Sequence, residues 1–128
     1  MSTFYQRLLQ ETEQERNAFL SIPLLHQAVA GELSEELYLS FLKQAYHHVK
    51  HTTPLLMACG SQLPERLEWL REAVGEYIEE EMGHQEWILN DIAALGEDKE
   101  AVRYGTPNIE TELMVSYAWD TIQRRNPV

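Results

Sequence analysis

The sequence holds little that a secreted or membrane protein needs. It contains a single cysteine, Cys59, which excludes an internal disulfide framework and fits a reducing compartment. No apolar run is long enough to cross a membrane. The first residues mix acids with bases and lack the apolar core of a signal peptide. These absences predict a cytoplasmic protein that does not associate with a membrane.

Positive charge is also scarce. The 128 residues include 10 Lys and Arg against 21 Asp and Glu, which gives a formal net charge of −11. This charge would repel a polyanion, so nucleic acid is excluded as an expected partner. Strand-like alternation and Gly-rich phosphate loops are missing as well. A hydrophobic content of 44% suits one modest core, and we expect a single all-α domain over residues 1–128.

Two long helical segments dominate the pattern, over residues 34–63 and 64–95. The first begins with Ser34 as a cap and carries Pro54 in its interior. Because proline lacks an N–H and clashes with the carbonyl four residues earlier, we expect a kink there. The two segments are expected to pack on each other in a bundle of four to five helices. Shorter helices are expected on either side of these segments. One is capped by Ser2 or Thr3 and ends at Pro23, and the next covers residues 24–30. After the long segments, a helix is expected over residues 98–104, and a last one runs from an Asn108 cap to Arg124.

Acidic and histidine side chains interrupt the inner stripe of the segment 64–95. The stripe recurs at spacings of three and four residues and consists of Leu67, Leu70, Val74, Tyr77, Glu81, His84, Ile88, Asp91 and Leu95. Glu81 and His84 lie together in its middle, with Asp91 two turns further along. A buried carboxylate or imidazole costs free energy unless it is paired or bound to a metal. The stripe therefore predicts either a metal site or a hydrogen-bonded structural pair.

Glu-x-x-His on the inner face of a helix bundle is the spacing of carboxylate-bridged iron and manganese proteins. A carboxylate oxygen together with an imidazole nitrogen suits Fe(II) or Mn(II). The alternative is that Glu81 and His84 hydrogen-bond each other and a neighbouring helix, since short motifs also occur by chance. Glu80 and Asp91 are candidates for further ligands, because a shift of one residue in register exchanges Glu80 for Glu81.

Histidines gather in the kinked segment, in the sequence YHHVKHTTP. On a helical projection His48 falls within the apolar face and His51 falls at its edge. His47 falls on the polar side, together with lysines. We therefore expect His48 to be covered, as a hydrogen-bonded core residue or a pocket residue, and His47 to be exposed.

Three segments, in chain order, resemble the heme-oxygenase-like superfamily: FLKQAYHHVKHTTPLLMACGSQLP, EYIEEEMGHQEWILNDI and TELMVSYAWDTI. The superfamily includes TenA-like and PqqC-like proteins and the iron-containing redox enzymes called heme-oxygenase-like diiron oxidases. An iron-dependent fatty-acid decarboxylase of this group uses the Glu-x-x-His spacing for two iron ligands. The resemblance implies a heme-oxygenase-like bundle with Glu81 and His84 as iron ligands. It also implies that the helix bearing His48 and His51 lines a pocket, and we expect Thr52 and Tyr77 to line it as well.

Members of this superfamily are considerably longer, and this chain resembles the N-terminal half of their fold. The rest of their metal site comes from later helices, which carry another Glu and then an Asp and a His one turn apart. Glu81 and His84 alone do not complete a diiron site, so either the chain is a fragment or a second chain supplies the remainder. We expect a homodimer, because a symmetric dimer brings two Glu-x-x-His motifs together.

The sequence favours a non-heme iron oxidoreductase, diiron in its complete form, that activates dioxygen on a small organic substrate. The expected cofactor is Fe(II), as one or two ions, with Mn as the alternative. Two other functions stay open. A TenA-like hydrolase would use Cys59 as its nucleophile. A non-catalytic helical dimerisation or binding module would use Glu81, His84 and Asp91 as a structural polar network.

Overall fold

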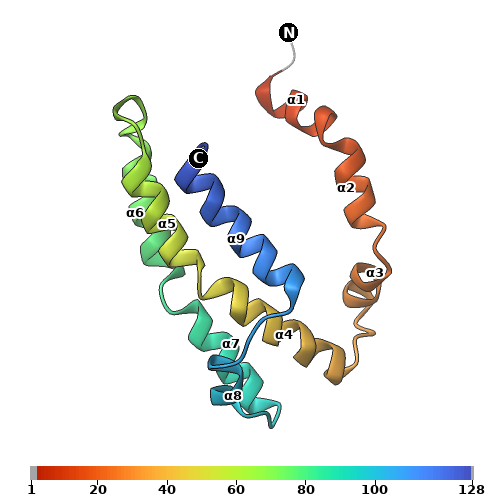
Figure 1. Cartoon of the computed structure of the whole chain (residues 1–128). Coiled ribbons are helices and arrows are strands. Elements are labelled where there is room, and N and C mark those ends of the chain that lie inside the picture. Colours follow the sequence, from red (N-terminus) through yellow and green to blue (C-terminus); the bar gives the residue numbers. More distant parts are fainter. Residues whose placement is uncertain (1–2, 128) are drawn as a thin grey trace. The chain divides into compact units, whose positions relative to one another are not determined.

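In the computed structural model, which describes residues 3–127, every regular element is a helix (Figure 1). The predicted all-α class is confirmed. The elements are α1 (Phe4–Glu11), α2 (Glu13–Leu20), α3 (Pro23–Ala30), α4 (Glu35–Val49), α5 (Thr52–Gln62), the short 3-10 helix η1 (Glu65–Leu67), α6 (Leu70–Glu81), α7 (His84–Ala94), α8 (Lys99–Arg103) and α9 (Ile109–Arg124).

Backbone contacts divide the chain into two compact units, one ending at Leu37 and the other beginning at Tyr38. The prediction that residues 1–128 form one domain stays a prediction. The sequence-predicted metal and pocket residues all belong to the second unit.

The first unit contains α1, α2 and α3. Its first helix begins with a capping box, in which the Gln6 N–H donates to Thr3 Oγ1 at 3.2 Å and the Thr3 N–H donates to Gln6 Oε1 at 2.9 Å. This confirms Thr3 as a cap, and the alternative cap, Ser2, lies outside the described residues. The helix expected up to Pro23 is divided at Thr12 into α1 and α2, and Pro23 starts α3.

The core of the second unit lies between α4 on one side and α7 and α8 on the other. Leu42 and Tyr46 of α4 contact the fully buried Leu89 and Ile92 of α7, together with Val102 of α8. Further along, α5 packs against α6 and also against α9 (Figure 1). The α4–α5 segment is therefore covered from two directions, by α6 to α8 and by α9.

The predicted kink in the segment 34–63 is confirmed, and it separates α4 from α5 at Lys50 and His51. Pro54 lies in the first turn of α5 and has no N–H to donate to the Lys50 carbonyl, with which its ring would also clash. The regular pattern resumes where the Leu55 N–H donates to the His51 carbonyl at 2.9 Å. The break thus falls one turn before the proline that causes it.

The predicted continuous helix over residues 64–95 is wrong, because a second break divides it. Met82 is extended, with φ −65° and ψ 119°, and Gly83 has a left-handed φ of 95°. Glycine has no Cβ and adopts this conformation readily, so the chain leaves α6 after Glu81 and re-enters a helix at His84. The nine-residue stripe therefore does not run along one helix, because its residues are divided among η1, α6, α7 and the residue that follows α7.

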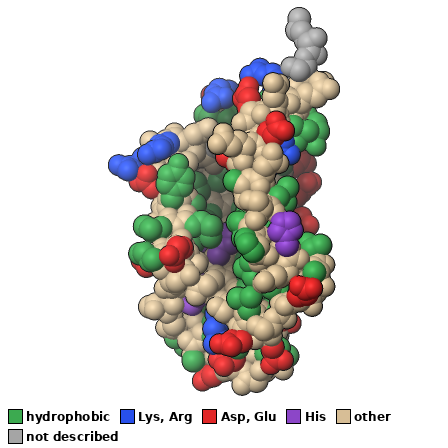
Figure 2. All heavy atoms as spheres, turned by 90° about the vertical axis from the view of Figure 1, so that its right-hand side faces the viewer, with side chains coloured by type: hydrophobic (Ala, Val, Ile, Leu, Met, Phe, Trp, Pro, Cys, Tyr) green, Lys and Arg blue, Asp and Glu red, His purple; other side chains and the backbone are tan. Residues whose placement is uncertain are grey.

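Many large apolar side chains remain exposed. Figure 2 shows apolar side chains on the face turned to the viewer, with acidic side chains between them. In the second unit the most exposed are Phe41, Trp69, Met82, Trp87, Tyr104, Ile109, Leu113 and Tyr117. Among the helices of residues 3–127, none combines the length and the apolar character that crossing a membrane requires.

Candidate metal centre

Glu81 and His84 meet across the break between α6 and α7. Glu81 is the last residue of α6, His84 is the first residue of α7, and His84 Nδ1 lies 3.0 Å from Glu81 Oε2. The two side chains are 20% and 27% exposed, so both are largely covered but remain accessible. The structure brings this predicted pair together, by a tight turn at Gly83 rather than by one turn of a continuous helix.

The hydrogen bond determines which atoms of the pair are available. An ionised carboxylate only accepts, so Nδ1 of His84 carries the proton that Glu81 Oε2 accepts. A neutral His84 ring then has its lone pair on Nε2. Nε2 lies on the far side of the ring from Glu81, so both side chains bind one ion only when Nδ1 gives up this proton and the ion takes its place. The pair therefore offers an imidazole nitrogen and carboxylate oxygens, which suit Fe(II) or Mn(II).

Apolar side chains border the pair. The ring centroids of His84 and Trp87 are 4.4 Å apart. Trp87 is 64% exposed and Met82, in the turn between the helices, is 62% exposed. A polar pair flanked by exposed apolar groups is typical of a surface that another segment covers.

The candidate further ligands do not join the pair. Glu80 and Asp91 are both exposed. Within the described part of the chain, no three His, Cys, Asp or Glu side chains are placed to hold a metal ion together. Glu81 and His84 therefore fit a metal ion as two of its ligands, and these residues do not complete its coordination.

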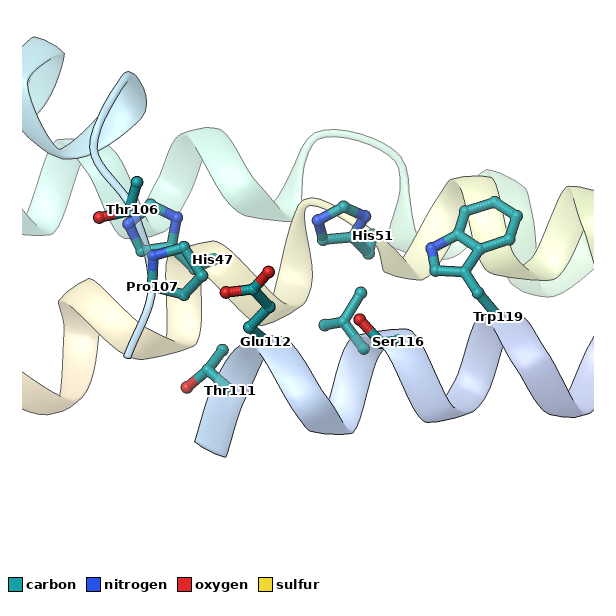
Figure 3. A pocket seen from close by; sticks show the side chains of 9 residues that line it. His47, His51, Thr106, Pro107, Thr111, Glu112, Ser116 and Trp119 are labelled. Atoms are coloured by element: carbon teal, nitrogen blue, oxygen red, sulfur yellow. The ribbon is translucent and has the colours of Figure 1, made fainter. Parts of the chain in front are cut away.

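A pocket of about 370 Å³ lies elsewhere in the second unit, against α9 (Figure 3). It is lined by His47, His51, Thr106, Pro107, Thr111, Glu112, Val115, Ser116 and Trp119. His51 lines this pocket, as the resemblance implied for a pocket in this region. His48, Thr52 and Tyr77 are not among the lining residues, and His48 and Tyr77 are exposed.

The exposures of two adjacent histidines are the reverse of those expected. His47 is 4% exposed, whereas His48 is exposed. The helical projection assumed one covered face for α4, but α9 covers a second. Thr111 of α9 donates its hydroxyl to Gln44 Oε1 at 3.0 Å, and Gln44, His47 and His51 follow each other at spacings of three and four. That polar stripe is the signal that would have indicated this second face.

Burial lowers the pKa of His47, and the neighbouring charge of Lys50 lowers it further. The Nζ of Lys50 lies 3.4 Å from His47 Nδ1. Burial likewise lowers the pKa of His51, with Lys50 again the second cause. Both imidazoles therefore favour the neutral form near pH 7.

Cys59 lies in α5 in a setting that disfavours a thiolate. Burial raises the pKa of its thiol, and Sγ donates to the Pro127 carbonyl at 2.8 Å. A nucleophilic cysteine needs a lowered pKa or an adjacent base. The environment of Cys59 therefore gives no support to the hydrolase interpretation.

Comparison with known proteins gives two matches that agree. A family model described as iron-containing redox enzyme matches residues 39–128. The crystal structure of a domain of unknown function with a heme oxygenase-like fold, from Shewanella denitrificans OS217, has a TM-score of 0.79 and 25% sequence identity to this chain. The match covers 99% of this chain and 55% of that one. No curated protein matches the sequence. The chain therefore has a heme oxygenase-like fold and belongs to the family of iron-containing redox enzymes.

Proposed function

We propose that this chain forms part of a non-heme iron oxidoreductase that activates dioxygen on a small organic substrate, with Glu81 and His84 as iron ligands. The observation that carries the proposal is the 3.0 Å contact between these two side chains in a member of an iron-containing family. Non-heme iron supplies the one-electron and dioxygen chemistry that protein side chains lack. Fe(II) is the proposed ion, as one or two ions, and Mn is the alternative.

The two side chains have distinct tasks in this proposal. His84 binds the ion through an imidazole nitrogen, and Glu81 binds it through a carboxylate oxygen. Without an ion, their mutual hydrogen bond keeps the two side chains together, and on binding the ion would replace the proton that they share. The turn at Gly83 fixes the two ends of α6 and α7 relative to each other, so the two side chains are close before an ion binds.

Two protein ligands are too few for a carboxylate-bridged site, so the remaining ligands must come from a segment that covers the pair. The exposed Met82 and Trp87 mark the surface on which that segment would lie. We place it in a second copy of the chain, as a homodimer, because a two-fold axis near this surface would bring two Glu81–His84 pairs together.

Dioxygen uptake tests the proposal directly. Metal-free protein is loaded with Fe(II) under anaerobic conditions, a reductant is added, and uptake is followed with an oxygen electrode after air is admitted. Wild type should take up dioxygen faster than the same Fe(II) without protein. His84→Ala should reduce uptake to the protein-free rate, whereas the control His48→Ala, which alters an exposed histidine outside the pair, should not. Uptake by His84→Ala at the wild-type rate would overturn the proposal.

A structural role for the pair is the second candidate, and the same hydrogen bond favours it. Glu81 and His84 satisfy each other without a metal. In that case Glu81→Gln and His84→Ala would lower the free energy of unfolding equally with and without iron. In the iron-binding case, added Fe(II) should stabilise wild type and not the His84→Ala variant.

A further inference from the structure

The pocket against α9 has mostly apolar walls and one formal charge. Pro107, Val115 and Trp119 provide apolar surface. Among the described residues that line the pocket, Glu112 is the one Asp, Glu, Lys or Arg. Figure 3 shows its side chain rising from α9 toward the α4–α5 junction, where His47 and His51 lie. A volume of about 370 Å³ suits a small molecule and lies near the lower end of the usual range for ligand sites.

The two histidines do not balance the charge of Glu112. Lys50 can only donate, so His47 Nδ1 must accept and the ring proton must lie on Nε2. With the pKa of each ring lowered by burial, both are largely neutral near pH 7. The pocket walls therefore carry a net negative charge.

Glu112 is exposed, so its carboxylate is open to solvent as well as to the pocket. In residues 3–127 it forms neither a side-chain hydrogen bond nor an ion pair, unlike neighbouring Thr111, whose hydroxyl donates to Gln44 Oε1 at 3.0 Å. The whole chain carries a net charge of −11, which raises the local concentration of cations. A carboxylate ligand would be repelled at this position, whereas an ammonium group would find an open acceptor.

We propose that this pocket binds a small organic cation, namely a protonated amine with an apolar body, whose ammonium group pairs with Glu112. The apolar body lies along Val115 and Trp119, whose ring can also contact the cation. His47 and Ser116 also line the pocket and add polar groups to its wall. We further infer that this cation is the substrate, and that role rests on the proposed iron chemistry. The binding of the cation to the pocket does not depend on iron.

Three probes with one body and different head groups test the proposal. They are 2-phenylethylamine, 2-phenylethanol and 3-phenylpropionate, titrated into metal-free wild-type protein by calorimetry at low salt. The amine should bind at least about tenfold more tightly than the alcohol, as expected for a charge-assisted contact. The carboxylate should bind most weakly. Equal affinity of amine and alcohol, preference for the carboxylate, or binding of none of the three would overturn the proposal.

A pair of charge variants on α9 locates the effect. Glu112→Gln should weaken the amine about tenfold and leave the alcohol unchanged. Glu110→Gln removes the same charge from a second exposed position, which does not line the pocket, and should leave the ratio of the two affinities as in wild type. If the two variants weaken amine binding equally, the preference for the amine over the alcohol comes from the overall charge of the chain. That result would overturn the assignment of the amine to this pocket.

The outcomes separate this proposal from the iron proposal. Amine binding is measured without metal, and iron binding is measured without amine. If the amine binds at Glu112 and His84 variants retain iron as wild type does, the pocket stands and the iron assignment fails. If wild type binds iron, His84 variants lose it and the amine does not bind, the iron assignment stands and the pocket proposal fails.

Discussion

His84 Nδ1 lies 3.0 Å from Glu81 Oε2 across a break between two helices. In a continuous helix, residues three apart face the same side whatever lies between them. Here the residues between them determine the geometry, because Gly83 takes the left-handed conformation that turns α6 into α7. The contact between Glu81 and His84 therefore depends on a residue that bears no ligand.

Gly83→Ala should lower the free energy of unfolding. Its φ is 95°, and a residue with a Cβ in the left-handed region costs about 1–2 kcal/mol. A Cβ at this position would meet no other atom within 4 Å, so the cost is conformational rather than steric. Urea unfolding measures it.

Gly75→Ala is the matched control for that substitution. Gly75 lies inside α6, and a Cβ added there would also meet no other atom within 4 Å. Because alanine is the better helix former, the control should gain about 0.5–1 kcal/mol. A Gly83→Ala variant as stable as Gly75→Ala would contradict a left-handed conformation at Gly83.

Acid should destabilise the second unit through His47. Its pKa in the folded protein is lowered by burial and by Lys50, so the unfolded chain binds the proton more readily. The stabilisation by the neutral ring is present above pH 6.5, the ordinary pKa, and is lost as the pH falls below it toward the folded value. The free energy of unfolding should therefore decrease as the pH is lowered from about 7.5 to about 5.5, a range that brackets the ordinary histidine pKa of about 6.5.

Substitution of His47 should flatten that pH dependence. His47→Gln removes one group whose pKa shifts on folding. His51, whose pKa is also lowered by burial, still contributes to the pH dependence of the unfolding free energy. His26→Gln, at an exposed histidine in the first unit, is the control and should keep the wild-type slope. A His47→Gln slope as steep as wild type would show that another group accounts for the acid sensitivity.

Cys59 should react slowly with iodoacetamide. Burial raises its pKa and its Sγ donates to the Pro127 carbonyl, so little thiolate forms near neutral pH. Alkylation of the folded protein should be at least about tenfold slower than in urea, and Cys59→Ser should retain dioxygen uptake. Faster alkylation in the folded state would revive the hydrolase interpretation.

The exposed Trp87 should mediate association. Light scattering should give wild type the mass of two chains. Trp87→Glu should give the mass of one, because it places a charge in an apolar interface. Trp69→Glu alters a tryptophan that is slightly more exposed and lies away from the pair, and it is the control. A monomeric wild type would mean that the ligands missing from the metal site come from a segment other than a second copy.

The features that local chemistry determines were predictable from the sequence. Asn108 Oδ1 accepts the Thr111 N–H at 2.9 Å, as its position before the last helix predicted. The kink caused by Pro54 follows from local chemistry of the same kind. Glu81 and His84 were also expected to be close, but they meet through the turn at Gly83 and not along one helix.

The features that depend on distant packing were not predictable in this way. The burial of His47 results from α9, whose Asn108 N–H donates to Gln44 Oε1 over a separation of 64 residues. Glu112 is exposed, and only the packing of α9 beside His51 makes it part of a pocket wall. The break at Gly83 was missed because a three-and-four pattern of side chains carries no information about backbone φ.

Iron content per chain tests the central claim most directly. Wild type, His84→Ala, Glu81→Gln and the exposed-neighbour control Glu80→Gln are reconstituted with Fe(II) under anaerobic conditions, desalted and assayed for iron. Wild type and Glu80→Gln should retain iron, and the other two should lose more than about tenfold in affinity. Retention of iron by His84→Ala as well as by wild type, or its absence from wild type, would contradict the assignment of Glu81 and His84 as iron ligands.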